Sequence, residues 1–374
     1  MIEFLEQCIR IPSLSGQERH VAEFLRDEMH KRGFKSHIDA AGNAVGVIGN
    51  GTRQLVMLGH MDTVGGDVPI RYEGNVLYGR GSVDAKGPLC AFILAAAAAF
   101  DTGRKSEDGR PMLRLPSTDW QLVVIGAVEE ESATAKGARY VARSYKPEMC
   151  IIGEPSGTNA VTLGYKGRLL VDAHFERESQ HTSIPGANPS EAAIGLWNWV
   201  NSFAERYNEG KAKAFDRILP SIRKIISGDD GLKEWCDVRL ALRLPLEMNP
   251  QAMGREIATY QLQSNSGDSP MGGSPECSMK FLGFEPAYRS AKDSTLARAF
   301  LDAIRNEKMR PAFKDKSGTS DMNVVGPIWN CPVVAYGPGD SSLDHTPIEH
   351  IEIAEFERAV RVLSHTLQIL IVGK

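Results

Sequence analysis

The chain has 374 residues with a formal net charge of −4, and 24% of the residues are charged. That length exceeds the size at which a single hydrophobic core usually stops growing, about 250–300 residues, so we expect about two domains. The small net charge, without a basic stripe or an acidic tail, argues against a nucleic-acid-binding protein. Small molecules or other proteins remain as the expected partners.

Cysteine usage and hydropathy indicate a soluble cytoplasmic protein. The six cysteines lie far apart without a C-x-x-C pair, so neither a disulfide framework nor a zinc ribbon is predicted. The N-terminal segment 1–13 carries acidic residues and lacks the apolar region of a signal peptide. The most apolar run, at 87–100, is shorter than the roughly 20 residues that a membrane span requires.

The first part of the chain alternates between helices and short strands. Ser15 and Glu18 form an S-x-x-E capping box before a segment of helical periodicity that ends at Gly33. The polar stretch at 101–119 is predicted to be a surface loop. The alternation predicts an α/β sheet covered by helices, with functional side chains at the strand ends. The elements expected after the first helix are strands at 44–49 and 54–60, a helix at 89–100, a strand at 120–128, a helix at 136–145 and a strand at 149–156.

The pattern changes in the middle of the chain and returns near its end. Longer alternating strands are expected at 168–179, 235–245 and 277–289, with helices at 190–208 and 250–262. This order predicts a small α+β unit of the β-α-β-β-α-β, or ferredoxin-like, kind. The first pattern resumes with a helix at 294–306, a strand at 331–337 and a helix at 353–370. We therefore expect a first domain formed by residues 1–163 and 288–374, interrupted by a second domain at 164–287.

Acidic residues and histidines cluster where predicted strands end. Any one of them alone is more readily explained as a buried, hydrogen-bonded group. Several carboxylates gathered at strand ends repel one another and lose hydration, which costs several kcal/mol per charge unless a cation offsets it. The residues concerned are His60, Asp62, Asp84, Glu129, Glu130, Glu131, Glu154, Asp344 and His345.

The types of these residues favour a pair of divalent metal ions. Histidine and carboxylate ligands without cysteine suit Zn²⁺, Co²⁺ or Mn²⁺. The ligands are too few to give two ions four each without sharing, so one carboxylate is expected to bridge two ions about 3.5–4 Å apart.

Five stretches, "GHMDTV", "RGSVDAKGP", "VEEES", "GEPS" and "DHTPIEHI", together resemble the M20 metallopeptidases, a family of dinuclear aminoacylases and carboxypeptidases. The resemblance covers nearly the whole chain, in the order and spacing of the family. It implies a zinc-aminopeptidase-like α/β catalytic domain with a mixed sheet and an inserted dimerisation or lid domain. It also implies a homodimer and two Zn²⁺ per chain, with Co²⁺ as the alternative.

The same resemblance implies a role for each residue at the strand ends. Asp62 would orient His60, and Glu129 would be the general base that takes a proton from the attacking water and returns it to the leaving amine. A solvated acidic turn is the alternative for "VEEES", but its place after the apolar "LVVIGAV" argues against that. The family also carries a cis peptide bond, which would be Asp84–Ala85. The implied ligands are His60 with Glu154 for one ion, His345 with Glu130 for the other, and Asp84 as the bridge.

Other residues match positions that contact substrate in the family. His181, in "ESQHTSIPGANP", corresponds to a lid-domain histidine that reaches the site of the partner subunit, with a surface histidine as the alternative. Arg243 matches an arginine that binds the substrate carboxylate, a task for which Arg239 on the same strand face competes. Gly318 and Thr319 lie in "KSGTSDMN", which resembles the G-T-S-D turn of the family and otherwise reads as an ordinary turn.

The stretches "KSGTSDMN" and "PVVAYGPGDSSLDHTPIEHI" together most resemble the branch that removes an acyl group from lysine or ornithine. This branch includes the hydrolases of lysine and arginine biosynthesis that release lysine from the amino-group carrier protein LysW. Alternatives are acetylornithine deacetylase, succinyl-diaminopimelate desuccinylase, a dipeptidase, or a non-catalytic relative that binds metal or peptide. Basic residues would give a carrier a positive rim, unless they are ordinary solvated charges; they are Lys166, Arg168, Arg305, Lys308, Arg310, Lys314 and Lys316.

Overall fold

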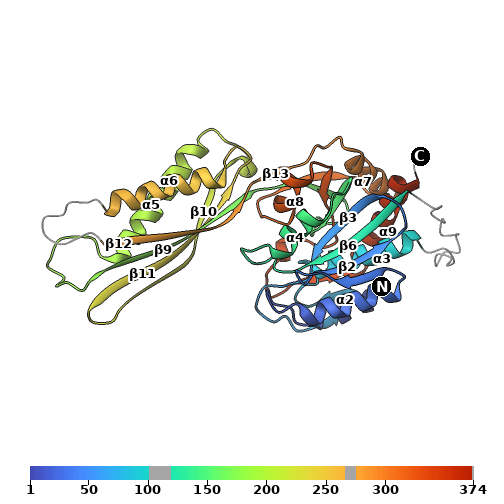
Figure 1. Ribbon diagram of the computed structural model, residues 1–374, viewed down its shortest axis with the longest axis horizontal. Helices are drawn as coiled ribbons and strands as arrows, with labels where there is room; N and C mark the ends of the chain where they lie inside the picture. The colour runs from blue at the N-terminus through green and yellow to red at the C-terminus, as the bar shows by residue number, and fades with distance from the viewer. Residues whose placement is uncertain (101–118, 266–274, 373–374) are drawn as a thin grey trace. The chain divides into compact units, whose positions relative to one another are not determined.

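A computed structural model describes residues 1–100, 119–265 and 275–372 (Figure 1). The polar stretch predicted as a loop, apart from Asp119, lies outside the described residues. Within these ranges, every helix is too short or too polar to span a lipid bilayer. The chain forms two compact units: a first unit of Met1–Gly164, Arg289–Asp315 and Ser320–Lys374, and an inserted unit of Tyr165–Tyr288 and Lys316–Thr319.

The first unit is built on a mixed sheet. In the described residues its strand order is β1-β2-β6-β3-β7-β15-β8-β13, with β14 paired to β8. The central strands β6, β3, β7 and β15 are parallel, whereas β2 runs antiparallel to β6. The carboxyl ends of the parallel strands therefore meet at one edge of the sheet. The strands are β1 (Lys35–Ile38), β2 (Ala44–Ile48), β3 (Arg53–His60), β6 (Trp120–Ala127), β7 (Met149–Gly153), β8 (Ala160–Tyr165), β13 (Tyr288–Arg289), β14 (Ala312–Lys316) and β15 (Val333–Ala335).

Helices and a small second sheet complete the first unit. Figure 1 shows β2, β6 and β3 in succession, with α3 and α9 beside them. The small sheet has the order β16-β5-β4. The elements are α1 (Ile2–Ile9), α2 (Arg19–Lys31), α3 (Lys86–Phe100), α4 (Lys136–Ser144), α7 (Thr295–Asn306), α8 (Met322–Trp329), η2 (Ser341–Leu343), α9 (Ile353–Val372), β4 (Arg71–Glu73), β5 (Val76–Tyr78) and β16 (His350–Glu352).

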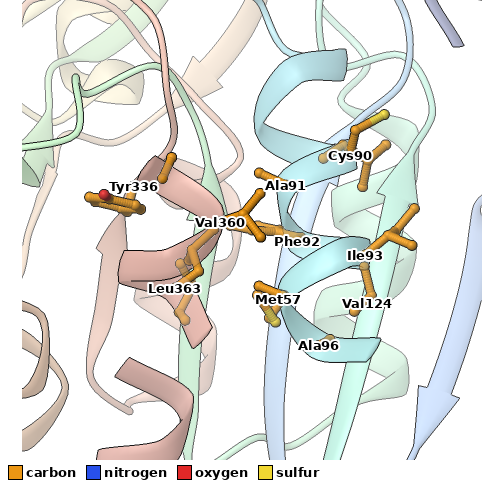
Figure 2. Packing of buried hydrophobic residues seen from close by; sticks show 14 of the residues in the cluster. Met57, Cys90, Ala91, Phe92, Ile93, Ala96, Val124, Tyr336, Val360 and Leu363 are labelled. Atoms are coloured by element: carbon orange, nitrogen blue, oxygen red, sulfur yellow. The ribbon is translucent and has the colours of Figure 1, made fainter. Parts of the chain in front are cut away.

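Helix α3 is the centre of the main hydrophobic core. It is rich in alanine and buried along most of its length, as expected of a helix that is apolar on every side. Met57 of β3 and Val124 of β6 face it, and Val360 and Leu363 of α9 join the same cluster (Figure 2). Strand alternation explains why Met57 lies on this face of the sheet.

Three glycines at the ends of adjacent strands allow α3 to lie close to the sheet. Gly59 of β3 is in register with Gly126 of β6 and with Gly153 of β7. A Cβ atom at Gly59 would lie 3.3 Å from Leu89 Cβ, and one at Gly153 would lie 3.0 Å from Phe92 Cε2. Larger residues would push the first turns of α3 away from the strand ends. These glycines thus fix the start of α3 beside the carboxyl edge of the sheet.

The inserted unit is an antiparallel sheet of order β10-β11-β9-β12, with α5 and α6 on one face (Figure 1). Its chain order, β9-α5-β10-β11-α6-β12, confirms the prediction of a smaller α+β, ferredoxin-like unit within an α/β chain. No strand was predicted at β10, which lies at one edge of this sheet. The elements are β9 (Gly167–Glu178), α5 (Pro189–Asn208), η1 (Ala214–Asp216), β10 (Leu219–Asp229), β11 (Lys233–Leu244), α6 (Pro250–Asn265) and β12 (Glu276–Glu285).

Candidate metal centre

The carboxyl ends of the parallel strands bring the predicted ligands together. His60 ends β3, and Glu154 follows β7. The His60 Nε2 atom lies 3.2 Å from Asp84 Oδ1 and 3.9 Å from Glu154 Oε1. The His345 Nε2 atom lies 2.9 Å from Asp84 Oδ2 and 2.9 Å from Glu131 Oε1. The two oxygens of Asp84 therefore face two different imidazoles, as a bridging carboxylate requires.

The donor atoms form two groups that share Asp84. One group is His60, Asp84 and Glu154, and the other is Asp84, Glu131 and His345. Within each group the ligand atoms lie within 4.8 Å of one another. A third, overlapping group joins His60 to Glu130 and Glu131. Histidine nitrogens and carboxylate oxygens in two groups around one shared carboxylate fit a pair of divalent ions.

The charges of the cluster also fit the binding of cations. Burial raises the pKa of Glu130 well above its ordinary value, and the nearby Glu154 carboxylate raises it further. Burial and the charge of Asp84 raise the pKa of Glu131. Hydrogen bonds to Asp84 and Glu131 raise the pKa of His345 to about 10. The cluster thus holds excess negative charge, which protons or metal ions must offset.

The acidic turn after β6 corrects one predicted pairing. Glu131, and not Glu130, contacts His345. Glu129 adopts a left-handed conformation with φ 57°. Its carboxylate accepts a hydrogen bond from Thr134 Oγ1 at 2.6 Å and lies 3.5 Å from Lys136 Nζ. Glu129 thus belongs to neither ligand group, and the turn presents the second and third glutamates to the cluster.

Asp62 supports both His60 and the acidic turn. Its Oδ1 atom lies 3.4 Å from His60 Nδ1, on the opposite side of the ring from Asp84. The same oxygen accepts the Glu130 N–H at 3.1 Å, and Oδ2 accepts the Glu131 N–H at 3.0 Å. The intervening Met61 is buried in the hydrophobic core. The Asp62 carboxylate therefore lies beside His60 Nδ1, which also contacts the Asp62 carbonyl oxygen at 3.1 Å, and it makes two backbone contacts that the sequence did not reveal.

Glu349 supports Asp84, the residue shared by the two donor groups, and was also missed. Its buried carboxylate accepts the N–H groups of Val83 at 2.9 Å and Asp84 at 3.1 Å, and it pairs with Arg80 Nη1 at 2.7 Å. The peptide bond between Asp84 and Ala85 is cis, as the resemblance implied. The only sequence signal for Glu349 was its place in "DHTPIEHI".

The cluster can be compared with known proteins. Residues 56–369 match the model of Peptidase family M20/M25/M40. The chain belongs to this peptidase family. It is therefore a hydrolase of a metal-dependent family, which confirms the predicted enzyme class. A LysW-lysine hydrolase of Deinococcus radiodurans is 43% identical to it over 99% of this chain and 97% of the relative.

More distant relatives support the same placement. A LysW-lysine/LysW-ornithine hydrolase of Sulfurisphaera tokodaii is 28% identical over 100% of this chain and 96% of the relative. Among solved structures, an M20 family metallo-carboxypeptidase of Sulfolobus solfataricus has a TM-score of 0.75 at 17% identity, with 98% of each chain covered. That structural likeness confirms the predicted fold of this M20 chain.

The predicted substrate residues of the M20 chain lie in its inserted unit. Arg243 Nη1 donates a hydrogen bond to Thr319 Oγ1, and Gly318 precedes that threonine. Arg239 is instead held by Asp172, through Nε at 2.5 Å and Nη2 at 2.6 Å. His181 is exposed, and its Nδ1 lies 2.8 Å from Ser183 Oγ. Arg239 is thus bound to a carboxylate, whereas Arg243 contacts the predicted turn residue Thr319.

Two of the residues assigned to a positive rim are not surface charges. Lys166 is buried, and its ammonium group donates to the carbonyl oxygens of Ala214 at 3.2 Å and Phe215 at 3.0 Å. Arg168 donates to Glu285 Oε2 at 3.0 Å. The prediction for this pair was therefore wrong, because both side chains satisfy groups inside the inserted unit. Exposed cations of that set remain in the first unit at Arg305, Lys308, Arg310 and Lys314.

Proposed function

We propose that this enzyme releases lysine, and ornithine as a second product, from an N²-acyl conjugate with the carrier protein LysW. The observation that carries the hydrolytic part is the pair of ligand groups sharing Asp84. The names of the relatives described above, at 43% and 28% identity over nearly the whole chain, support the substrate. The exposed cations of the first unit, Arg305, Lys308, Arg310 and Lys314, would attract an acidic carrier.

The ligand groups suit two Zn²⁺ ions, with Co²⁺ as the alternative. One ion would be held by His60, Asp84 and Glu154, and the other by Asp84, Glu131 and His345. Such ions polarise a carbonyl group and make water a stronger nucleophile at neutral pH. The support for zinc is the donor set, which is nitrogen and oxygen with no sulfur.

Glu130 is the proposed general base, in place of Glu129. Its Oε2 atom lies 4.0 Å from His60 Nε2, so its carboxylate faces the cluster without belonging to either group that shares Asp84. Burial raises its pKa, so it accepts a proton more readily than an exposed carboxylate does. Glu130 would take a proton from the attacking water and deliver it to the amine nitrogen as the amide C–N bond breaks.

The substrate residues have distinct proposed tasks. The guanidinium of Arg243, with Gly318 and Thr319 beside it in the same unit, offers donors for the free carboxylate of the lysine half. His181 would donate to the oxyanion that forms at the carbonyl carbon. The carboxylate of Asp62 keeps His60 and the acidic turn in position while the proton moves.

A homodimer and a cytoplasmic location complete the proposal. The outer strand β10 exposes Ile222, Ile225 and Ile226 at 41%, 49% and 43%. An exposed apolar edge strand favours pairing with another strand, which supports association through the inserted unit. The cysteines are all free, which suits a reducing compartment. Light scattering of the purified chain tests the dimer.

A substrate panel tests the function. Rates per active site, as kcat/KM, are compared for LysW-linked lysine, LysW-linked ornithine, acetyl-lysine, acetyl-ornithine and succinyl-diaminopimelate, with and without added Zn²⁺ or Co²⁺. We expect the carrier-linked lysine to react fastest and the metal-free protein to be inactive. Equal turnover of free acetyl-lysine and the carrier conjugate would refute the carrier. Preference for acetyl-ornithine or succinyl-diaminopimelate would assign one of the other activities of the family.

A further inference from the structure

The segment before α2 lies against the residues that follow β3. Ser13 Oγ donates to the Met61 carbonyl at 2.7 Å, and the Thr63 N–H donates to the Ser13 carbonyl at 2.8 Å. Ser15 Oγ donates to Asp62 Oδ2 at 2.7 Å. These contacts join positions 47 to 50 residues apart in the sequence. The segment therefore braces the loop that carries Asp62.

Glu18, at the end of this segment, does not cap α2 with its side chain. The helix begins at Arg19 with no side-chain hydrogen bond from its N-cap residue. Glu18 is buried, with 5% of the residue exposed, and its Oε1 atom accepts the N–H groups of Gly16 at 2.9 Å and Glu129 at 3.0 Å. The capping box predicted for Ser15 and Glu18 is thus wrong, because α2 begins only at Arg19 and the two side chains bind Asp62 and the Glu129 N–H instead.

Two carboxylates hold the three consecutive backbone N–H groups of the acidic turn. Asp62 accepts those of Glu130 and Glu131, and Glu18 accepts that of Glu129. Glu129 is also the residue in the left-handed region, a conformation that costs free energy in a residue with a side chain and persists only where surrounding contacts hold it. The contact from Glu18 is made at the residue where the chain turns.

We propose that Glu18 is a positioning residue for the acidic turn. By holding the Glu129 N–H, it keeps that residue in the left-handed conformation from which Glu130 and Glu131 reach the cluster. Glu18 touches neither a ligand atom nor the substrate, so it acts through the backbone. The inference rests on the proposed function for the roles of Glu130 and Glu131, but not for the geometry of the turn.

The test compares Glu18→Ala and Glu18→Gln with a matched control, Glu28→Ala. Glu28 lies on α2, is similarly buried at 8%, and binds Lys31 and Arg32 without touching the turn. The first measurement is amide hydrogen exchange of the peptide covering 128–133 in the metal-free protein. We expect exchange at least about tenfold faster in Glu18→Ala and unchanged in Glu28→Ala. The Gln variant keeps an acceptor oxygen, so it should restore part of the protection and remains available if the Ala variant does not fold.

The second measurement titrates Co²⁺ into the metal-free proteins and follows the visible absorption of the bound ion. Glu18→Ala should weaken one of the two Co²⁺ equivalents by about tenfold, while Glu28→Ala leaves both unchanged. Unchanged exchange in both Glu18 variants would overturn the proposal. Failure of the wild-type chain to bind two ions would instead contradict the proposed metal centre, and the exchange data would still decide the role of Glu18.

Discussion

Replacing the three glutamates of the acidic turn one at a time by glutamine tests the assignment of their roles. The structure turns Glu129 toward Thr134, Glu130 toward His60 and Glu131 toward His345. Glutamine keeps the size of the side chain and removes its charge, so folding should survive each change. The three variants should then differ in which property they lose.

Glu130→Gln should lose activity and keep its metal. A general base contributes roughly 10²–10⁴-fold to the rate, which corresponds to about 3–5 kcal/mol of activation free energy. Glu131→Gln should lose one of the two ions, because Glu131 is a donor in the group with Asp84 and His345. The kcat/KM of Glu129→Gln should stay within about threefold of the wild-type value. The Glu129 carboxylate contacts Thr134 and Lys136, and 19% of its side chain is exposed.

The assay combines kcat and KM on the best substrate of the panel with metal content by mass spectrometry of the same samples. Circular dichroism melting curves control for folding. A loss of about 10² in Glu129→Gln, with nearly normal Glu130→Gln, would refute the geometry and restore the assignment drawn from the sequence. Loss of one ion in Glu130→Gln but not in Glu131→Gln would refute the ligand assignment alone.

Three further changes have defined outcomes. Chelation should lower Tm, and Zn²⁺ restored at about 100 times its Kd should return about 2.7 kcal/mol of stability; an unchanged melting curve would contradict a structural contribution from the ions. Gly153→Ala should destabilise the chain by about 1–3 kcal/mol in urea titrations, because the new Cβ would lie 3.0 Å from Phe92. Burial lowers the pKa of Lys166 from 10.5 to about 8. Between about pH 8 and pH 10.5 the unfolded chain therefore keeps a proton on Lys166 that the folded chain releases. The stability of wild type relative to Lys166→Met should therefore rise from about pH 8 to about pH 10.5, and a flat or falling difference would contradict it.

The fold was predictable where the pattern of apolar residues has one structural solution. The run 54–60 is too short and too apolar for a surface helix, and β3 spans Arg53–His60. Strand β10 was missed because its residues include Pro220, Arg223 and Lys224 without a clean alternation. A strand at the edge of a sheet buries less surface, so its sequence shows a weaker alternation of apolar and polar residues.

The metal cluster was predictable as a set of residues, but not in all of its pairings. His60, Asp84 and Glu154 follow from chemically distinct motifs, and the structure places them together. In "VEEES" three identical side chains follow one another, so residue type cannot say which of them faces His345. The choice depends on the left-handed turn at Glu129, a backbone property set by contacts distant in sequence. Glu18 was misassigned for the same reason, since its partner lies 111 residues away.

The row of glycines under α3 has a consequence for the choice of metal. Asp84 lies two residues before α3 begins, so a change in the height of that helix above the sheet would change the distance of the shared carboxylate from His60 and Glu154. That height is fixed by hydrocarbon contacts of Leu89 and Phe92 with bare backbone. Selectivity between ions of different radius would then depend on the hydrophobic core. Replacing one of these glycines by alanine would alter it without changing any residue that contacts an ion.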